Sequence, residues 1–230
     1  MSWRDGLAAL PNLSPAGFQL DARKSALFVV DMQYIDAHRD HGLGTMLKAE
    51  YPAVWRYYFE RVERLVVPNT ARLIAASRAA GLRVIYLTIG PVLPDGADMV
   101  ALRRPAVSEG LAPMLHHQGS FGHGILNELA PAPGELVVNK TSRGAFNSTA
   151  LERLLLNLGL ESLVFAGVTT SACVDTTARD AVDRGFRAVL VEDATAELDE
   201  ASHEATLFQF AVRWGPVWTT AETLERLKPA

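Results

Sequence analysis

The sequence has few of the features that mark secreted, membrane-spanning or nucleic-acid-binding proteins. Its 230 residues include one cysteine, Cys173, so an intrachain disulfide is excluded. The longest apolar stretch without a charge covers residues 162–174, which is shorter than the roughly 20 residues that a spanning helix needs. The first residues lack the basic and apolar regions of a secretory signal. We therefore expect a cytoplasmic protein that does not insert into a membrane.

The charge balance is close to even and slightly acidic. There are 22 Lys and Arg residues against 26 Asp and Glu residues, which gives a net charge of −4. Because no long basic run is present, neither nucleic acid nor an anionic membrane surface is an expected partner. Hydrophobic residues make up 49% of the chain, enough to bury a core and to exclude disorder over most of its length. We expect one domain spanning residues 1–230.

Apolar runs alternate with helical patterns along the chain. The runs resemble strands that are buried on both faces of a parallel sheet, and they cover residues 25–30, 82–88, 135–138, 162–167 and 187–191. Between them, apolar residues recur at helical spacing, as in Val174, Ala178 and Ala181. Thr149 and Glu152 have the spacing of a capping box at a helix start. This alternation predicts a doubly wound α/β domain with a mainly parallel sheet.

Besides an N-terminal extension, two segments do not fit the minimal alternation. Residues 1–23 form an N-terminal extension, and residues 34–64 indicate a loop and an extra helix whose aromatic residues suit a core or a subunit interface. Residues 90–124 are rich in Gly and Pro and indicate a long loop of the kind that is often functional.

An acid, a base and a thiol follow three of the predicted strands. Asp31 follows the first strand, Lys140 the third, and Cys173 the fourth. Ligands of open α/β sheets bind at the carboxyl ends of the strands, so we expect these three side chains to converge. Together they are the parts of an activated nucleophile. Taken singly, each has an ordinary alternative: a buried small side chain for the thiol, a cap or turn for the acid, and a solvated lysine.

The thiol is expected at the start of a helix. Thr170 or Ser171 is a suitable N-cap, which places Cys173 in the first turn. The helix dipole and a nearby lysine would lower the pKa of the thiol.

The histidines fit ordinary roles. His203 could pair with Cys173, but its neighbour Glu204 indicates a polar helix face. His116, His117 and His123 lie in the long loop without a carboxylate motif, which does not favour a metal cluster.

Three motifs make the family recognisable. They are Asp31-Met32-Gln33 after an apolar strand, Lys140 followed by Gly144-Ala145-Phe146, and residues 167–174, which read Gly-Val-Thr-Thr-Ser-Ala-Cys-Val. Their order and spacing, over residues 24–225, resemble the isochorismatase-like cysteine hydrolases. The resemblance implies a Rossmann-like three-layer fold with a six-stranded sheet and a triad of Asp31, Lys140 and Cys173. It also implies a cis peptide between Val168 and Thr169, and an oxyanion hole made by the backbone N–H groups of Thr169 and Cys173.

Departures from the family pattern narrow the expected chemistry. Where nicotinamidases have a metal-binding Asp-x-His after the second strand, this chain has Thr88-Ile89-Gly90, so we expect no metal and no cofactor. Vinyl-ether-cleaving isochorismatases commonly lack the cysteine, which is present here. Both departures favour hydrolysis of a C–N bond in a small amide, ureide or carbamoyl compound through a thioester. A vinyl ether hydrolase and a non-catalytic small-molecule-binding protein on the same scaffold remain the alternatives.

Candidate substrate-binding residues and assembly complete the expectations. The residues are those beside the triad motifs and in the long loop: Gln33, Tyr34, Phe146, Arg103 and Arg104. The resemblance favours a homo-oligomer, a dimer or a tetramer, whose substrate is a small amide or ureide.

Overall fold

A computed structural model describes residues 2–10, 12–13, 16–100 and 116–228. Its centre is a sheet of six strands in the order β4-β3-β2-β5-β6-β7, in which all paired strands are parallel. The strands are β2 (Ser25–Val30), β3 (Arg83–Ile89), β4 (Leu136–Lys140), β5 (Ser162–Val168), β6 (Arg187–Ala196) and β7 (Val217–Trp218). The predicted α/β class and the six-stranded parallel sheet are therefore confirmed.

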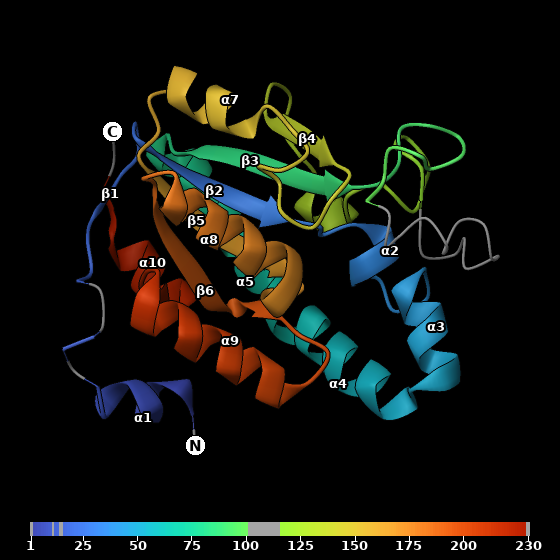
Figure 1. Cartoon of the computed structure of the whole chain (residues 1–230), viewed down its shortest axis with the longest axis horizontal. Helices are drawn as coiled ribbons and strands as arrows, with labels where there is room; N and C mark the ends of the chain where they lie inside the picture. The colour runs from blue at the N-terminus through green and yellow to red at the C-terminus, as the bar shows by residue number, and fades with distance from the viewer. Residues whose placement is uncertain (1, 11, 14–15, 101–115, 229–230) are drawn as a thin grey trace.

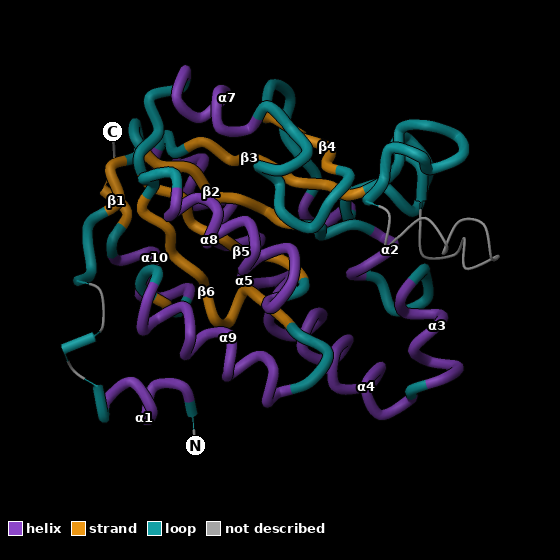
Figure 2. Tube along the Cα trace, viewed as in Figure 1, coloured by secondary structure: helices purple, strands orange, loops and turns teal. Residues whose placement is uncertain are grey.

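Helices cover both faces of this sheet, which gives three layers (Figure 1). One face packs against α4 (Pro52–Arg61), α5 (Val67–Ala80) and α10 (Thr220–Glu225). The other packs against α7 (Leu151–Asn157), α8 (Asp175–Asp183) and α9 (Glu200–Arg213). Figure 2 shows the strands as one layer between these helices. Because the central strands β2 and β5 are buried along their whole length, they read in the sequence as continuous apolar runs.

The strand order creates a switch point between β2 and β5. From β2 the chain proceeds outward to β3 and β4, whereas from β5 it proceeds the other way to β6 and β7. The connections leaving the carboxyl ends of β2 and β5 therefore diverge to opposite sides. Such a divergence leaves a crevice at that edge, where ligands of doubly wound proteins bind.

The outer strands differ from the sequence expectation. β4 lies at the sheet edge with Val137 47% exposed, so the prediction that residues 135–138 are buried on both faces was wrong. The strand expected at residues 187–191 is longer, since β6 continues to Ala196. Its pairing with β5 shifts register between Phe165 and Gly167.

The predicted loop and extra helix at residues 34–64 contain more helix than expected. This segment forms α2 (Tyr34–Ala37), α3 (Leu43–Glu50) and α4, and a π-helical segment, η1 (Val62–Val66), joins α4 to α5. At α7 the expected capping box is absent. Ala150 is the N-cap, and the hydroxyl of Thr149 accepts the Leu151 N–H at 3.0 Å. A 3-10 turn, η4 (Asn127–Leu129), precedes β4.

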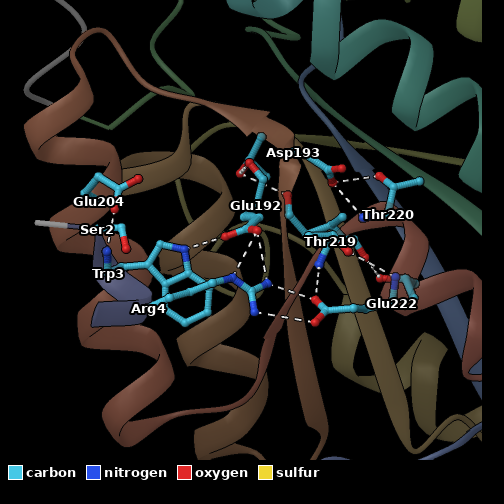
Figure 3. Close-up of polar contacts among 12 residues, drawn as sticks. Ser2, Trp3, Arg4, Glu192, Asp193, Glu204, Thr219, Thr220 and Glu222 are labelled. Carbon is cyan, nitrogen blue, oxygen red and sulfur yellow. Dashed lines mark hydrogen bonds and ion pairs between the residues drawn. The ribbon is translucent and has the colours of Figure 1, made fainter. Parts of the chain in front are cut away.

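The N-terminal extension docks on the domain. Its helix α1 (Trp3–Ala8) packs on α9, and the indole N–H of Trp3 donates to Glu192 (Figure 3). The guanidinium of Arg4 bridges Glu192 and Glu222 at 3.0 and 2.9 Å. Farther along, β1 (Leu20–Asp21) pairs in parallel with β8 (Leu227–Lys228). Among the described residues, no helix is long and apolar enough to cross a membrane.

Candidate active site

Asp31 occupies a strained position at the carboxyl end of β2. Its φ is +49°, in the left-handed region, where aspartate is one of the few residues other than glycine found regularly. Its N–H donates to the carbonyl of Leu87 at 2.9 Å, which ties this end of β2 to β3. Strained backbone of this kind gathers at functional sites, where the surrounding structure holds it in place.

Gly167 of β5 allows the two central strands to meet beside Asp31. Its φ is +123°, and a Cβ at this position would lie 2.0 Å from the carbonyl oxygen of Val30. Only glycine therefore fits, because the obstacle is backbone that cannot rotate away.

Lys140 and Asp31 form a buried ion pair. Lys140 is the last residue of β4, two strands from β2, a separation of about 10 Å at the usual strand spacing. Its extended side chain crosses the end of β3 and places Nζ 2.8 Å from Oδ2 of Asp31. Burial alone lowers the pKa of Lys140, but the charge of Asp31 and the hydrogen bond to its carboxylate raise the pKa above its ordinary value. The lysine is therefore a fixed positive charge inside the protein.

Cys173 lies in a π-helical turn, η5 (Thr170–Val174), which leads into α8. Thr169 is the N-cap, one residue before the first of the two candidates that the sequence suggested. The Val168–Thr169 peptide is cis. The Thr169 carbonyl accepts the N–H groups of Ala172 and Val174, at 3.2 and 3.3 Å. Among the described residues, the Thr169 carbonyl does not accept a hydrogen bond from the N–H of Cys173, which lies between these two donors. The wide turn thus keeps that N–H out of the bond it would make in a regular helix.

The thiol of Cys173 is protonated at neutral pH. Burial raises its pKa to about 12, the charge of Asp31 adds to this rise, and Lys140 opposes it. The expectation that the pKa of the thiol is lowered was therefore wrong, because burial and the charge of Asp31 outweigh the effect of Lys140. Oδ1 of Asp31 is buried without a hydrogen-bond partner among the described atoms, so this oxygen is free to accept a proton.

Two further residues bind the turn around the thiol. Glu197 was not predicted from the sequence, and the surroundings of His203 were misjudged. Glu197, which follows β6, accepts the Ser171 N–H at 2.7 Å and is buried. His203 of α9 is also buried, with its Nδ1 2.9 Å from the hydroxyl oxygen of Thr170. The prediction that His203 lies on a polar helix face was wrong, because the residue is buried. The contacts that the structure describes for its ring are with Arg61 and Thr170 and do not include Cys173. Only the spacing of apolar residues around His203 on α9 could have indicated its burial.

Gln33 is a structural clamp. Its amide nitrogen donates to the carbonyls of Ile89 and His123 at 3.3 and 2.8 Å, and its amide oxygen accepts the Ile89 N–H at 2.7 Å. The side chain is fully buried. Because both amide hydrogens are used, the prediction that Gln33 binds substrate does not fit the structure. The residue fastens the loop after β3 to the end of β2.

Tyr34 and Phe146, two further residues predicted to bind substrate, contact other aromatic rings. The ring of Tyr34 lies 4.5 Å from that of Phe121, in a group with His38 and His41. The ring of Phe146, in contrast, stacks 6.3 Å from Phe186.

Phe146 does not fit its predicted role. The guanidinium of Arg184, just beyond the C-terminal end of α8, also lies over its ring. Substrate binding by Phe146 therefore finds no support in these contacts. Arg103 and Arg104 lie outside the described residues.

The sequence places three histidines in the long loop, and the structure describes contacts of two of them with amide and carbonyl oxygens. Nε2 of His123 lies 2.8 Å from the amide oxygen of Asn139, and His117 contacts the carbonyl of Pro94 at 3.0 Å. Over residues 2–10, 12–13, 16–100 and 116–228, no three His, Cys, Asp or Glu side chains are grouped so that they could hold a metal ion.

This chain resembles known proteins over most of its length. Residues 25–222 match the isochorismatase domain. The chain belongs to the isochorismatase family. Within that family, it is 32% identical over 227 residues to ureidoacrylate amidohydrolase RutB from Variovorax paradoxus (strain S110), covering 94% of this chain and 86% of that protein.

Solved structures share the fold. A cysteine hydrolase from Pseudomonas syringae pv. phaseolicola 1448A is 25% identical with a TM-score of 0.77, over 92% of this chain and 95% of that one. N-carbamoylsarcosine amidase from Thermoplasma acidophilum, 24% identical, has a TM-score of 0.63 over 86% of this chain and 98% of that one, a likeness of fold alone. The predicted resemblance is confirmed, and the chain is a hydrolase of this family.

Proposed function

We propose that the protein hydrolyses a C–N bond in a small amide, ureide or carbamoyl compound, with Cys173 as nucleophile and a thioester as intermediate. The observation that carries this proposal is the buried trio of Asp31, Lys140 and Cys173 at the switch point of the sheet. An ion pair at this depth is costly to bury and contributes little net stability, which favours a chemical role.

The first step is proton transfer from the Cys173 thiol to the Asp31 carboxylate. Because burial raises its pKa to about 12, the thiol is almost entirely protonated at pH 7. A standing thiolate is thus too rare, and the thiol needs a base within reach. Lys140 holds Asp31 in place and stabilises the negative charge on the sulfur.

The second step is attack of the sulfur on the substrate carbonyl carbon. The negative charge then forms on the carbonyl oxygen, and we place the backbone N–H groups of Thr169 and Cys173 as its donors. The Cys173 N–H suits this role because the π-helical turn does not commit it to the Thr169 carbonyl. Fixed donors of this kind, in a site shielded from water, stabilise the oxyanion strongly.

The remaining steps return the enzyme to its starting state. Protonated Asp31 gives its proton to the nitrogen as the C–N bond breaks, which releases ammonia or an amine and leaves an acyl group on Cys173. Asp31 then takes a proton from water, and the hydroxide displaces the sulfur. The sulfur takes back that proton from Asp31, which restores the thiol and the carboxylate, and the acid or carbamate product leaves.

The substrate class is supported by the curated relative. Its name is ureidoacrylate amidohydrolase, and a ureido group is cleaved at a C–N bond. The presence of the thiol disfavours the vinyl ether alternative, in which no acyl group would be transferred. The buried Asp31–Lys140 pair disfavours a non-catalytic binding protein, since such a protein needs no buried charge beside a thiol.

A substrate screen tests the proposal. Ammonia release is measured for wild type, Cys173→Ala and Cys173→Ser on a panel that includes ureidoacrylate, N-carbamoylsarcosine, biuret and simple amides. We expect turnover of at least one compound by wild type, and its loss in both variants with an unchanged circular dichroism spectrum. Iodoacetamide should label Cys173 of the native protein and block turnover. Turnover by Cys173→Ala at the wild-type rate would overturn the proposal.

Assembly and location are proposed separately. We propose a homo-oligomer, a dimer or a tetramer, in the cytoplasm. The exposed ring of Tyr51, between α3 and α4, supports a contact between subunits. Light scattering after gel filtration tests the assembly, and a monomer at micromolar concentration would contradict it.

A further inference from the structure

A series of polar contacts through Arg61, His203 and Thr170 connects α9 to the turn that carries the nucleophile. Arg61, at the end of α4, donates through Nη2 to the carbonyl of Glu192 at 2.7 Å and through Nε to the carbonyl of Thr195 at 3.0 Å. The same Nη2 lies 2.7 Å from Nε2 of His203. On the other side of the ring, Nδ1 lies 2.9 Å from Oγ1 of Thr170. Thr170 and His203 are both buried.

The contact with Arg61 fixes which ring nitrogen of His203 carries the proton. A guanidinium has donors and no acceptor, so Nε2 must accept through its lone pair. Nδ1 therefore carries the hydrogen and donates it to the Thr170 hydroxyl. Burial, then the positive charge of Arg61, lowers the pKa of His203 to about 3, so the ring stays neutral at physiological pH. A neutral ring with both nitrogens occupied is not an acid or a base for the reaction.

Thr170 is the first residue of η5, the turn in which Cys173 lies. It follows Thr169, whose backbone N–H is one of the two oxyanion donors placed above. Glu197 holds the next residue, Ser171, from the end of β6. The turn is thus held on two sides by groups from different elements. This arrangement fixes the peptide planes at the start of the turn without touching the sulfur.

Resting on the proposed function, we infer that His203 is a positioning residue for the oxyanion hole: it fixes the Thr169–Thr170 backbone through Nδ1–H···Oγ1 while Arg61 fixes the ring. The role differs from a Cys–His pair, in which the ring would exchange a proton with the sulfur. The proposed role also differs from general packing of the side chain, because it depends on the single hydrogen bond from Nδ1 of His203 to Oγ1 of Thr170.

Two matched pairs of variants separate these roles. In His203→Asn the amide nitrogen takes the place of Nδ1 and keeps the donor to Thr170. In His203→Gln the amide reaches the place of Nε2 and keeps the contact with Arg61 only. Thr170→Ser retains the acceptor, whereas Thr170→Val removes it at nearly constant shape. Each pair thus keeps or removes the same hydrogen bond.

The readouts are steady-state turnover of the best compound from the panel and the rate of Cys173 alkylation by iodoacetamide. Alkylation occurs at a CH₂ carbon and forms no oxyanion, so it reports the thiol, Asp31 and Lys140 alone. We expect kcat to fall tenfold or more in His203→Gln and Thr170→Val, with KM and the alkylation rate within threefold of wild type. His203→Asn and Thr170→Ser should stay within threefold for all three quantities.

Several outcomes would overturn the inference. One is wild-type kcat in Thr170→Val, and another is an equal loss in His203→Asn and His203→Gln. A parallel loss of alkylation and kcat in Thr170→Val would assign His203 to the thiol instead. The imidazole ¹⁵N spectrum of the wild type gives a test independent of activity, since His203 must show a protonated Nδ1 and an unprotonated Nε2. Should wild type alkylate at Cys173 but turn over no panel member, the proposed function fails while this spectrum still decides the hydrogen bond.

Discussion

Nζ of Lys140 and Oδ2 of Asp31 lie 2.8 Å apart, with both side chains buried, although 109 residues separate them in the chain. The pair needs three strands of the sheet to form, because β3 lies between β2 and β4. Removing either partner leaves the other charge buried and uncompensated. This relationship underlies the first prediction.

Asp31→Asn should lose the general base and lower kcat by about 10²–10⁴. Lys140→Met should cause a comparable loss, and it should also destabilise the fold by about 3–5 kcal/mol because the Asp31 charge is left unpaired. Ammonia release and chemical denaturation measure these effects. The control is Lys24→Met, which breaks the exposed Lys24–Glu161 pair of similar length, 2.7 Å. Near-wild-type activity in Asp31→Asn or Lys140→Met would show that the triad assignment is wrong.

Gly167→Ala should destabilise the protein by about 3 kcal/mol or more, because the new Cβ meets backbone and the φ is unfavourable. Its Cβ would lie 2.0 Å from the carbonyl oxygen of Val30, next to Asp31. Gly159→Ala is the matched control. Its φ is also positive, +66°, but nothing lies within 4 Å of the added Cβ, so a loss of about 1 kcal/mol is expected. Equal midpoints of urea unfolding for the two variants would contradict this reading.

Much of the site could be predicted from the sequence because its residues follow apolar runs. Asp31, Lys140 and Cys173 each come directly after or near the end of a strand, and parallel strands bring their carboxyl ends to one edge. The direction of the pKa shift at Cys173 could not be predicted, because it depends on burial by residues remote in sequence. His203 was misjudged for the same reason, since its partner Arg61 lies 142 residues away. Gln33 sits in a recognisable motif, yet its amide is used by the backbone of a later loop.

The free energy of unfolding should decrease as the pH is lowered, because His203 has a lower pKa in the folded protein than in the unfolded chain. Its pKa of about 3 in the folded protein lies below the ordinary value of 6.5. The unfolded chain therefore takes up a proton first, and the stabilisation present above pH 6.5 is lost as the pH falls toward 3. The loss between pH 8 and pH 5 should be about 2 kcal/mol. His203→Asn, which does not titrate, should lose that much less over the same range in urea unfolding. Identical pH profiles for the two proteins would contradict the shift.

Activity should not depend on a metal ion. The described chain groups no three metal-binding side chains, and the proposed steps use a thiol, a carboxylate and a lysine. Dialysis against EDTA should leave ammonia release unchanged, with inductively coupled plasma mass spectrometry confirming that metals were removed. Loss of activity that zinc or iron restores would show that the proposed mechanism is incomplete.

The most direct test of the central claim is rapid acid quenching during turnover, followed by mass spectrometry of the peptide that contains Cys173. The proposed mechanism predicts that a fraction of this peptide carries the acyl group of the substrate on sulfur, and that the adduct disappears when substrate is exhausted. Turnover with Cys173 unmodified at every quench time, together with wild-type turnover in Cys173→Ala, would contradict it.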